Sequence, residues 1–413
     1  MVTLRPFKAL RPDEKYVDRV AALPYDTMNT QEARIMAQGN PYNYLRIDRA
    51  EIDLPEGADI HSDQVYAKAG QNLRAFIEEG ILVKEAEPAL YIYREVMDGR
   101  AQVGIVGCVA VDESLDGTIK KHEHTKPDKV EDRTRHIEAC QANTGTILLT
   151  YRDDARVEAI MANKMREKPI YDFVSEDGVG HTVWKLDGQE MEDLVEAFKG
   201  IDNLYVADGH HRTAAAENYA VKMRKEVGDY TGQEEFNYYL AMIAPKNSMY
   251  VMDYNRVVED LNGHDFETFR NLVQIDQVDK AYKPKEKYEY SMYVDGVWYR
   301  LRVKDEIIDT INKTSENLAI DLLDVSLLHD LLIEPILGID VPQKDKRIDF
   351  IGGIRGLGEI EKRVEEGMRL GFALYPTGIE ELMAVADMDG VMPAKSTWFE
   401  PKVRCGLFLH MMD

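Results

Sequence analysis

The chain has few cysteines and no long hydrophobic run, and both features limit the classes of protein to which it can belong. Its 413 residues include three cysteines, Cys108, Cys140 and Cys405, which are spaced too widely for a paired metal-ligand motif. An odd number also argues against a disulfide framework. No stretch approaches the ~20 apolar residues that cross a membrane, and the first residues lack the apolar core of a signal peptide. We therefore expect a cytoplasmic protein without a membrane partner.

Positive charge is scarce as well. The 51 lysines and arginines are outnumbered by 75 acidic residues, for a net charge of −24. Repulsion of this size opposes binding to a nucleic-acid backbone unless a strong basic patch exists. The densest basic stretch, residues 120–135, is interleaved with acids. We expect a small-molecule partner and no nucleic acid.

Two common catalytic signatures are missing. The chain contains neither the G-x-x-x-x-G-K-[ST] phosphate loop nor the G-x-S-x-G nucleophile elbow, which argues against P-loop ATPases and serine hydrolases. Hydrophobic residues at 44% and charged residues at 31% are typical of a folded globular protein. The length suits two or three domains.

The order of hydrophobic patterns predicts an α+β to mixed α/β fold. Asp-Gly pairs at 98–99, 177–178 and 295–296 each indicate a β-hairpin. Residues 112–132 look polar and irregular. Helices are expected over residues 30–38, 62–79, about 131–142, 155–166, 190–198 and 319–337, and strands over 42–47, 146–151, 204–207, 238–244, 349–353 and 371–374.

One short stretch carries most of the chemistry. Residues 204–207 form an apolar strand, Asp208-Gly209 breaks it, and a helix is expected from Thr213 to Gly228. His210, His211 and Arg212 would then lie where the strand passes into the helix. The first turn of a helix has unpaired N–H groups and a partial positive charge, so it binds anions.

The residue types at this junction suit a phosphate. Gly209 lets a ligand approach the backbone closely, and Arg212 offers a fork of donors to phosphate oxygens. Asp208 supplies a carboxylate for a metal or a hydroxyl. The pattern predicts a phosphate site with catalytic side chains. The alternative is an ordinary Asp-Gly turn before a solvated helix start.

A second candidate is His122-Glu123-His124, within a polar loop. On a strand the two histidines would share one face and Glu123 would point the other way. Glu123 suits a general base or a group that orients a hydroxyl. The histidines lack the i, i+4 spacing of the helical zinc motif. A solvated loop of mixed charge is the alternative.

Two further stretches have both a functional and a structural interpretation. Arg133 and Arg135 flank an expected helix start, where they would contact phosphate or form local ion pairs on a surface turn, which we favour. Lys395 and Ser396 lie in a loop bounded by prolines and would line a pocket. Alternatively, the aromatic residues that follow, at 398 and 399, hold the C-terminal part against the core.

These motifs together resemble a known family. The ordered set is Leu23-Pro-Tyr-Asp26, Asn40-Pro-Tyr-Asn-Tyr-Leu-Arg46, His122-Glu-His-Thr125, Ala207-Asp-Gly-His-His-Arg212 and Met392-Pro-Ala-Lys-Ser-Thr397. It is similar to a large prokaryotic family named only as a domain of unknown function and often described as similar to the free-serine kinase of archaea. The resemblance implies a ParB/sulfiredoxin-like core over residues 116–245. Additional α/β regions over 1–115 and 246–413 would flank it, as separate parts or as one body.

The resemblance also implies roles for single residues. Gly209 and the first residues of the helix, from His210 to Thr213, would hold the phosphates of ADP or ATP. Asp208, His211 and Glu123 would be catalytic, and Asp208 would contact Mg²⁺. The residues implied in substrate binding are His122, His124, Lys395 and Ser396.

The implied activity is a Mg²⁺-dependent phosphotransferase that interconverts L-serine and O-phosphoserine with an adenine nucleotide. A kinase site is competent in both directions, so transfer toward serine is equally expected. The alternatives are a metal-dependent phosphodiesterase or nuclease, and a ParB-like protein that binds nucleotide without catalysis. The sequence indicates no oligomeric state.

Overall fold

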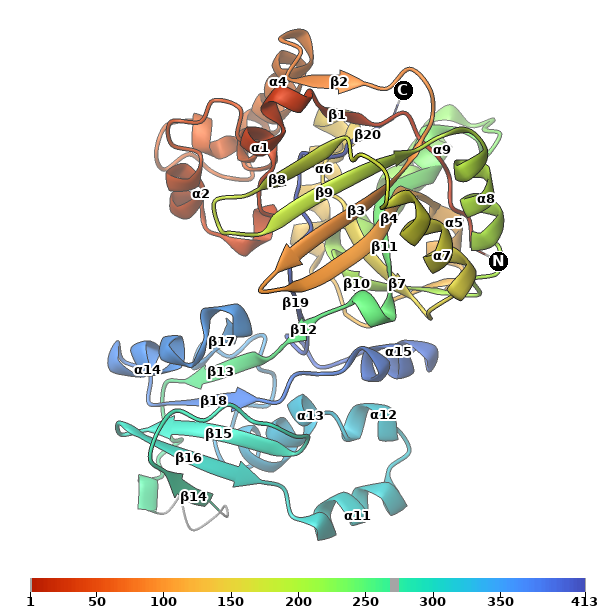
Figure 1. Cartoon of the computed structure of the whole chain (residues 1–413). Helices are drawn as coiled ribbons and strands as arrows, with labels where there is room; N and C mark the ends of the chain where they lie inside the picture. Colours follow the sequence, from red (N-terminus) through yellow and green to blue (C-terminus); the bar gives the residue numbers. More distant parts are fainter. Residues whose placement is uncertain (1, 268–274, 413) are drawn as a thin grey trace. The chain divides into compact units, whose positions relative to one another are not determined.

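The structure is a computed structural model that describes residues 2–267 and 275–412 (Figure 1). The chain forms two compact units. The first consists of Met1–Lys121, Thr125–Met249 and Pro401–Asp413, and the second of His122–His124 and Tyr250–Glu400. The second unit is therefore an insertion in the sequence of the first.

A mixed eight-stranded sheet forms the centre of the first unit, in the order β5-β10-β7-β11-β4-β3-β9-β8. β10 pairs in parallel with β5 and antiparallel with β7. The sheet combines two strands from residues 90–110 with six strands from residues 119–245, so it crosses the boundary expected near residue 115. Its strands are β3 (Leu90–Met97), β4 (Arg100–Ala110), β5 (Ile119–Lys120), β7 (Ile147–Tyr151), β8 (Tyr171–Val174), β9 (Gly180–Leu186), β10 (Leu204–Asp208) and β11 (Tyr238–Pro245).

Helices pack around this sheet, and α6 contacts both α4 and α9. The α-helices of the first unit are α1 (Val17–Val20), α2 (Thr30–Met36), α3 (Leu45–Asp48), α4 (Asp63–Glu78), α5 (Val111–Leu115), α6 (Pro127–Cys140), α7 (Ala155–Lys164), α8 (Gly188–Phe198) and α9 (His210–Val227). The 3₁₀ turns are η1 (Glu14–Tyr16), η2 (Tyr25–Thr27), η3 (Ala50–Asp53), η4 (Glu235–Asn237) and η5 (Lys246–Ser248).

The last residues of the chain return to the first unit. β20 (His410–Met411) pairs with β6 (Ala142–Asn143), and β1 (Leu10–Pro12) pairs with β2 (Leu82–Lys84). Leu10 and Leu409 exchange backbone hydrogen bonds of 3.0 and 2.9 Å. Phe408 and Leu409 are buried, so the C-terminal segment is part of the core.

Two predictions for the first unit are wrong. Residues 42–47 form no strand, because the Asn43 side chain accepts a hydrogen bond from the Leu45 amide and starts α3 there. Residues 112–132 are not irregular throughout. They contain the end of α5, strand β5 and the start of α6, which begins at Pro127, a residue suited to a first helical turn.

A six-stranded sheet forms the second unit, in the order β14-β16-β15-β18-β13-β17, and the described pairings are all antiparallel. A separate pair joins β12 and β19. The strands are β12 (Val251–Met252), β13 (Tyr254–Val258), β14 (Ile275–Val278), β15 (Glu289–Val294), β16 (Val297–Arg302), β17 (Ile348–Gly352), β18 (Leu370–Leu374) and β19 (Trp398–Phe399).

The long helix expected over residues 319–337 is divided into short elements. Leu323 takes extended backbone angles, φ −68° and ψ 138°, which end α12. The next residue, Asp324, accepts a hydrogen bond of 2.6 Å from the Tyr288 amide, so a tertiary contact opposes the continuous helix. The helices of this unit are α11 (Asp305–Thr314), α12 (Leu318–Asp321), α13 (Asp324–Leu328), the π-helical turn η6 (His329–Ile333), η7 (Gly353–Arg355), α14 (Leu357–Glu365) and α15 (Ile379–Asp387).

The mixed α/β class is confirmed, as are the three Asp-Gly hairpins. The finer expectation of a ParB/sulfiredoxin-like core stays a prediction. In residues 2–267 and 275–412, no helix is long and apolar enough to span a membrane. The three cysteines are free and buried.

Candidate functional site

The turn between β10 and α9 has the geometry that the sequence predicts, with an earlier helix start. Gly209 has φ 101° and precedes the helix, which begins at His210 rather than Thr213. The Thr213 amide donates to the Gly209 carbonyl at 2.9 Å and closes the first turn. A Cβ at position 209 would lie 3.1 Å from Nε of Arg212. The positive φ favours glycine, and a side chain at this position would also crowd the Arg212 guanidinium.

The Arg212 side chain folds back across Gly209 and is 9% exposed. Its Nη1 donates to the Thr146 carbonyl at 2.5 Å, and its Nη2 lies 3.3 Å from Oδ2 of Asp208. Burial opposes the charge, but the carboxylates of Asp208 and Asp26 outweigh it and raise the pKa of Arg212. The guanidinium is therefore a fixed positive charge at the start of α9.

Asp208 lies between two cations. Lys402 approaches Oδ1 at 3.5 Å, and Arg212 approaches Oδ2. A resident divalent ion would have to compete with both charges. In the described part of the chain, the one group of three side chains close enough to share a metal is elsewhere, at residues 329–334. The residues around Asp208 therefore do not fit a protein-held Mg²⁺.

A small cleft of about 20 Å³ lies beside this turn. Enclosed space of this size holds one or two water-sized groups. Its polar lining residues include two arginines, one aspartate and one tyrosine. The lining residues are Tyr25, Asp48, Arg133, His136, Ile137, Asn143, Thr144, Gly145, Ile147 and Arg212.

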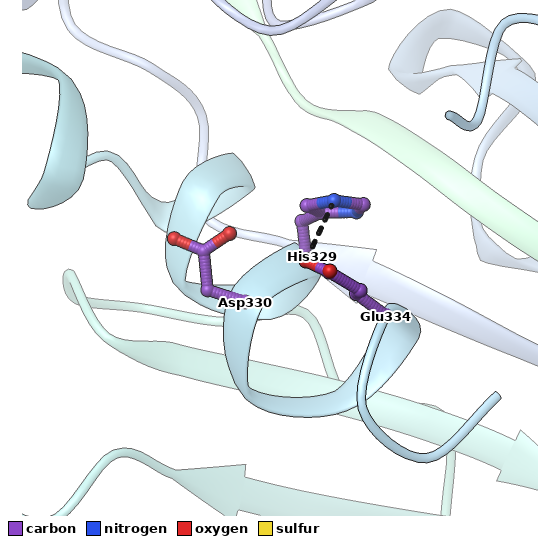
Figure 2. A group of neighbouring side chains, drawn as sticks. All are labelled: His329, Asp330 and Glu334. Atoms are coloured by element: carbon purple, nitrogen blue, oxygen red, sulfur yellow. Dashed lines mark ion pairs between the residues drawn. The ribbon is translucent and has the colours of Figure 1, made fainter. Parts of the chain in front are cut away.

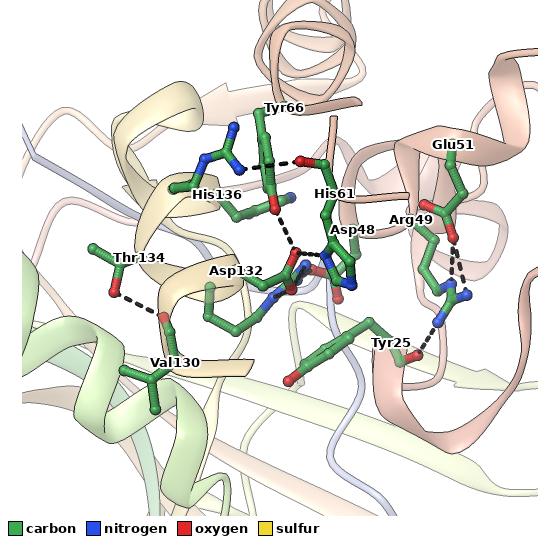
Figure 3. Close-up of polar contacts among 12 residues, drawn as sticks. Tyr25, Asp48, Arg49, Glu51, His61, Tyr66, Val130, Asp132, Thr134 and His136 are labelled. Atoms are coloured by element: carbon green, nitrogen blue, oxygen red, sulfur yellow. Dashed lines mark hydrogen bonds and ion pairs between the residues drawn. The ribbon is translucent and has the colours of Figure 1, made fainter. Parts of the chain in front are cut away.

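Arg133 supplies the second guanidinium, from α6, and its partners Tyr25, Asp48 and Asp132 are labelled in Figure 3. Its Cζ lies 4.0 Å from the Tyr25 ring centre, its Nε donates to Asp132 at 2.8 Å, and its Nη1 contacts Asp48 at 3.4 Å. Burial opposes the charge, yet Tyr25 and the two carboxylates raise the pKa of Arg133. The cleft thus has two permanent positive charges, each paired with acids.

Arg133 and Arg135 have different surroundings. Arg135 pairs with the exposed carboxylate of Asp63 and donates to the His61 carbonyl at 3.0 Å, as the surface alternative predicts. Arg133 is 9% exposed and contradicts that alternative. The sequence spacing indicates this burial, because Arg133 lies three residues after Val130 and four before Ile137, on the apolar face of α6.

His136 is a buried, neutral part of the cleft. Its Nε2 lies 3.0 Å from the Ile47 carbonyl and therefore carries the proton, while Nδ1 accepts from the Thr144 hydroxyl at 3.2 Å. Burial and the Arg133 charge lower the pKa of His136. The imidazole therefore links the Ile47 carbonyl to the Thr144 side chain without adding charge.

The N-terminal motifs build the other wall. Tyr25 lines the cleft, and the Tyr44 hydroxyl donates to the Thr144 carbonyl at 2.9 Å. A Cβ on Gly145 would lie 3.2 Å from Cδ of Arg212, so glycine permits that side chain to pass. Sequence reasoning did not assign Tyr25, Asp48, Arg133 or His136 to this site.

The loop after β5 contributes to both units. The Lys126 amide donates to Nε2 of His211 at 3.1 Å, which joins the end of the loop to the first turn of α9. His122, Glu123 and His124 belong to the second unit, where the Met392 amide donates to the His122 carbonyl at 2.8 Å. The structure therefore joins the 122–125 motif to the 392–397 motif through the backbone.

The remaining candidates differ in exposure. His210 and His122 are buried, Glu123 and His211 are half-buried, and His124 is exposed. Lys395 has φ 62°, and Ser396 Oγ donates to the Pro393 carbonyl. Lys395 and Ser396 belong to the second unit, whereas Asp208–Thr213 belong to the first.

A family model described as "Protein of unknown function (DUF1015)" matches residues 4–326. The chain belongs to this family. No curated protein matches the sequence.

Several solved structures are weakly similar to this chain. A C-terminally truncated SbnI from Staphylococcus aureus is 13% identical, with a TM-score of 0.37 over 73% of this chain and 85% of SbnI. A conserved hypothetical protein from Pyrococcus furiosus is 13% identical, with a TM-score of 0.32 over 71% and 90%. Free serine kinase in complex with AMP is 12% identical, with a TM-score of 0.34 over 73% and 91%. Similarities this low do not establish a shared fold.

Proposed function

We propose that the first unit is a phosphotransferase that moves a phosphoryl group between an adenine nucleotide and the hydroxyl of L-serine, in either direction. One observation carries the proposal: the buried guanidinium groups of Arg133 and Arg212 line one cleft at the N-terminus of α9. Arginine forks and helix N-termini are the two protein features that best match phosphate oxygens.

The size of the cleft limits what enters it. A space of about 20 Å³ admits oxygens of an anionic group but no nucleoside. The phosphate end of the ligand would therefore enter between the arginines, and the rest would remain outside. The adenine nucleotide and serine are proposed from the similarity of the Asp208–Arg212 motif to that of the free-serine kinase.

The proposed step is an in-line displacement. The serine Oγ attacks the terminal phosphorus, the bond from phosphorus to the leaving nucleotide oxygen breaks, and the hydroxyl proton passes to a carboxylate. Asp208 is the proposed acceptor of that proton, and Arg212 would stabilise the charge on the transferred group. Because the Asp208 surroundings do not fit a resident metal, a Mg²⁺ ion would enter with the nucleotide phosphates.

Two arginines on one helix give a matched test. Arg133→Gln should lower phosphoryl transfer by at least about 100-fold, because it removes a charge from the cleft. Arg135→Gln, on the exposed face of α6, should leave transfer unchanged. The assay follows labelled phosphate from ATP or ADP to serine and from phosphoserine to nucleotide.

The outcomes separate the proposed functions. Equal activity of the two variants would remove the cleft from the mechanism. Saturable nucleotide binding without transfer to serine, or from phosphoserine, would favour a non-catalytic binding protein. Cleavage of an added oligonucleotide by the wild-type protein would favour the phosphodiesterase alternative.

A further inference from the structure

The second unit contains a buried arginine, Arg256, that pairs with no carboxylate of the described residues. Four arginines are buried in the described residues, and three of them pair with a carboxylate: Arg133 with Asp48 and Asp132, Arg212 with Asp208, and Arg404 with Asp177. Arg256 is 4% exposed and has no carboxylate within ion-pair distance in the described chain. A buried charge without a counter-charge is costly.

Neutral groups surround the Arg256 guanidinium. Nη1 donates to the Tyr254 carbonyl, and Nη2 donates to the Lys395 carbonyl at 3.1 Å. Its plane lies over the ring of Phe350, its cross-strand neighbour on β17, at 5.3 Å. Burial lowers the pKa of Arg256 to about 10, and the nearby tyrosines compensate only in part. These contacts fix the position of the group without neutralising it.

Arg256 lines a cavity of about 270 Å³ in this unit. The volume suits a small organic molecule. One wall comes from Val325, His329 and Ile333, which are four residues apart and so lie on one face of α13 and η6. Most of the remaining lining is apolar or is provided by prolines.

The 392–397 loop forms another wall. Pro393 and Ala394 line the cavity, and the next carbonyl, of Lys395, accepts from Arg256. Lys395 has φ 62°, a left-handed conformation that is rare outside glycine. Ser396 holds this geometry: Oγ donates to the Pro393 carbonyl, and its own carbonyl accepts from Thr377 at 3.0 Å. The strained backbone presents an acceptor to the arginine.

We propose that this cavity is a second ligand site, in which Arg256 pairs with the carboxylate or phosphate of a small organic anion whose apolar part packs against Val325, Ile333 and Phe350. The inference goes beyond the proposed function, because every residue in it belongs to the second unit. The ligand supplies the negative charge that the chain does not place beside Arg256.

Asp340 is the one acidic residue in the lining of the cavity, and it is not within ion-pair distance of Arg256. Figure 2 shows His329, Asp330 and Glu334 at the π-helical turn, where Glu334 approaches Nε2 of His329 at 3.6 Å. Glu334 and Asp340 are exposed. His329 lines the cavity and offers a second nitrogen donor to the anion. The acids do not make a metal site here, because nothing besides their proximity indicates an ion.

Two ring-bearing probes, phenyl phosphate and benzoate, test the site and distinguish the two anions. Titration calorimetry on the full chain should show saturable binding of at least one of them. Arg256→Gln should weaken that binding by at least about tenfold, because it removes a charge-assisted hydrogen bond. Val341→Trp, at the partly exposed edge of the cavity, should also block binding while leaving Arg256 in place.

The control is Arg369→Gln, which removes an exposed arginine of the same unit that pairs with Asp295. It should bind the probe as the wild type does. Circular dichroism reports whether each variant is folded. Absence of saturable binding by the wild-type chain would overturn the proposal, as would unchanged affinity in folded Arg256→Gln and Val341→Trp. Phosphoryl transfer is assayed separately, so failure of either site is recognised independently.

Discussion

At the scale of single residues, Asp208 has the clearest test. Asp208→Asn removes the negative charge that Lys402 and Arg212 share, while the shape of the side chain is kept. We expect phosphoryl transfer to fall by at least about 100-fold, the usual contribution of a general base. Thermal melting followed by circular dichroism should still show a folded chain. Turnover at the wild-type rate would exclude Asp208 from the chemistry.

Asp324 should make stability depend on pH. Its side chain is buried, and burial raises its pKa from 3.8 to about 7. Between these values the folded chain holds a proton that the unfolded chain has released, so stability falls as pH rises through this window. The expected slope is on the order of 1 kcal/mol per pH unit.

Denaturant melts of wild type and Asp324→Asn between pH 4 and about 8 measure this effect. His181 acts in the opposite direction, because burial and the Arg404 charge lower its pKa to about 3 and the unfolded chain then binds the extra proton. The difference between the two proteins isolates Asp324. A difference that does not change with pH would contradict the assignment.

At the scale of elements, the two ends of α9 allow a comparison of glycines. Gly209 has φ 101° and lies against Arg212, while Gly228 has φ 76° and open space around it. Gly228→Ala should cost about 1 kcal/mol of unfolding free energy, from backbone strain alone. Gly209→Ala should cost more and should also displace Arg212. Denaturant unfolding measures both variants, and equal losses would show that the Arg212 contact is unimportant.

Local rules predicted much of the element pattern. Asp98-Gly99 joins β3 and β4 because both residues adopt the positive φ that this turn needs. The helix α2 is marked by a capping box between Asn29 and Glu32. The strand expected over residues 42–47 is absent because alternation indicates a strand only when a partner strand exists, and here Asn43 starts a helix instead.

The site was predictable in part. Asp208–Thr213 could be recognised because the strand, the Gly209 turn and the helix follow one another in sequence. Tyr25, Asp48 and Arg133 reach the same cleft from distant segments, and no local pattern states that they meet. Arg256 carried no motif at all. Its proposed role depends on the fold, which places no carboxylate of the described residues within ion-pair distance of it.

At the scale of the whole molecule, we expect the segment after residue 400 to determine whether the first unit is stably folded. Phe408 and Leu409 are at most 1% exposed, and β20 pairs with β6. Burial of two such side chains contributes roughly 3–6 kcal/mol, comparable with the net stability of a domain. Deletion of residues 401–413 should therefore unfold the first unit.

Limited proteolysis with mass spectrometry detects this unfolding. In the chain that lacks residues 401–413, new cleavage is expected within residues 1–249. Phe408→Ala is a milder test than the deletion and should lower the unfolding free energy by about 3–5 kcal/mol. Protection of residues 1–249 in the deleted chain would show that the returning segment is dispensable.

The return of residues 401–413 to the first unit has a consequence for protein synthesis. The early segments, up to Met249, leave the ribosome well before their last partner has been translated. At bacterial or eukaryotic elongation rates, roughly 150 intervening residues take about 8–30 s. During that time the surfaces that will cover Phe408 and Leu409 stay open to solvent and to chaperones. The inserted unit is translated during this delay, so the part translated first is the part completed last.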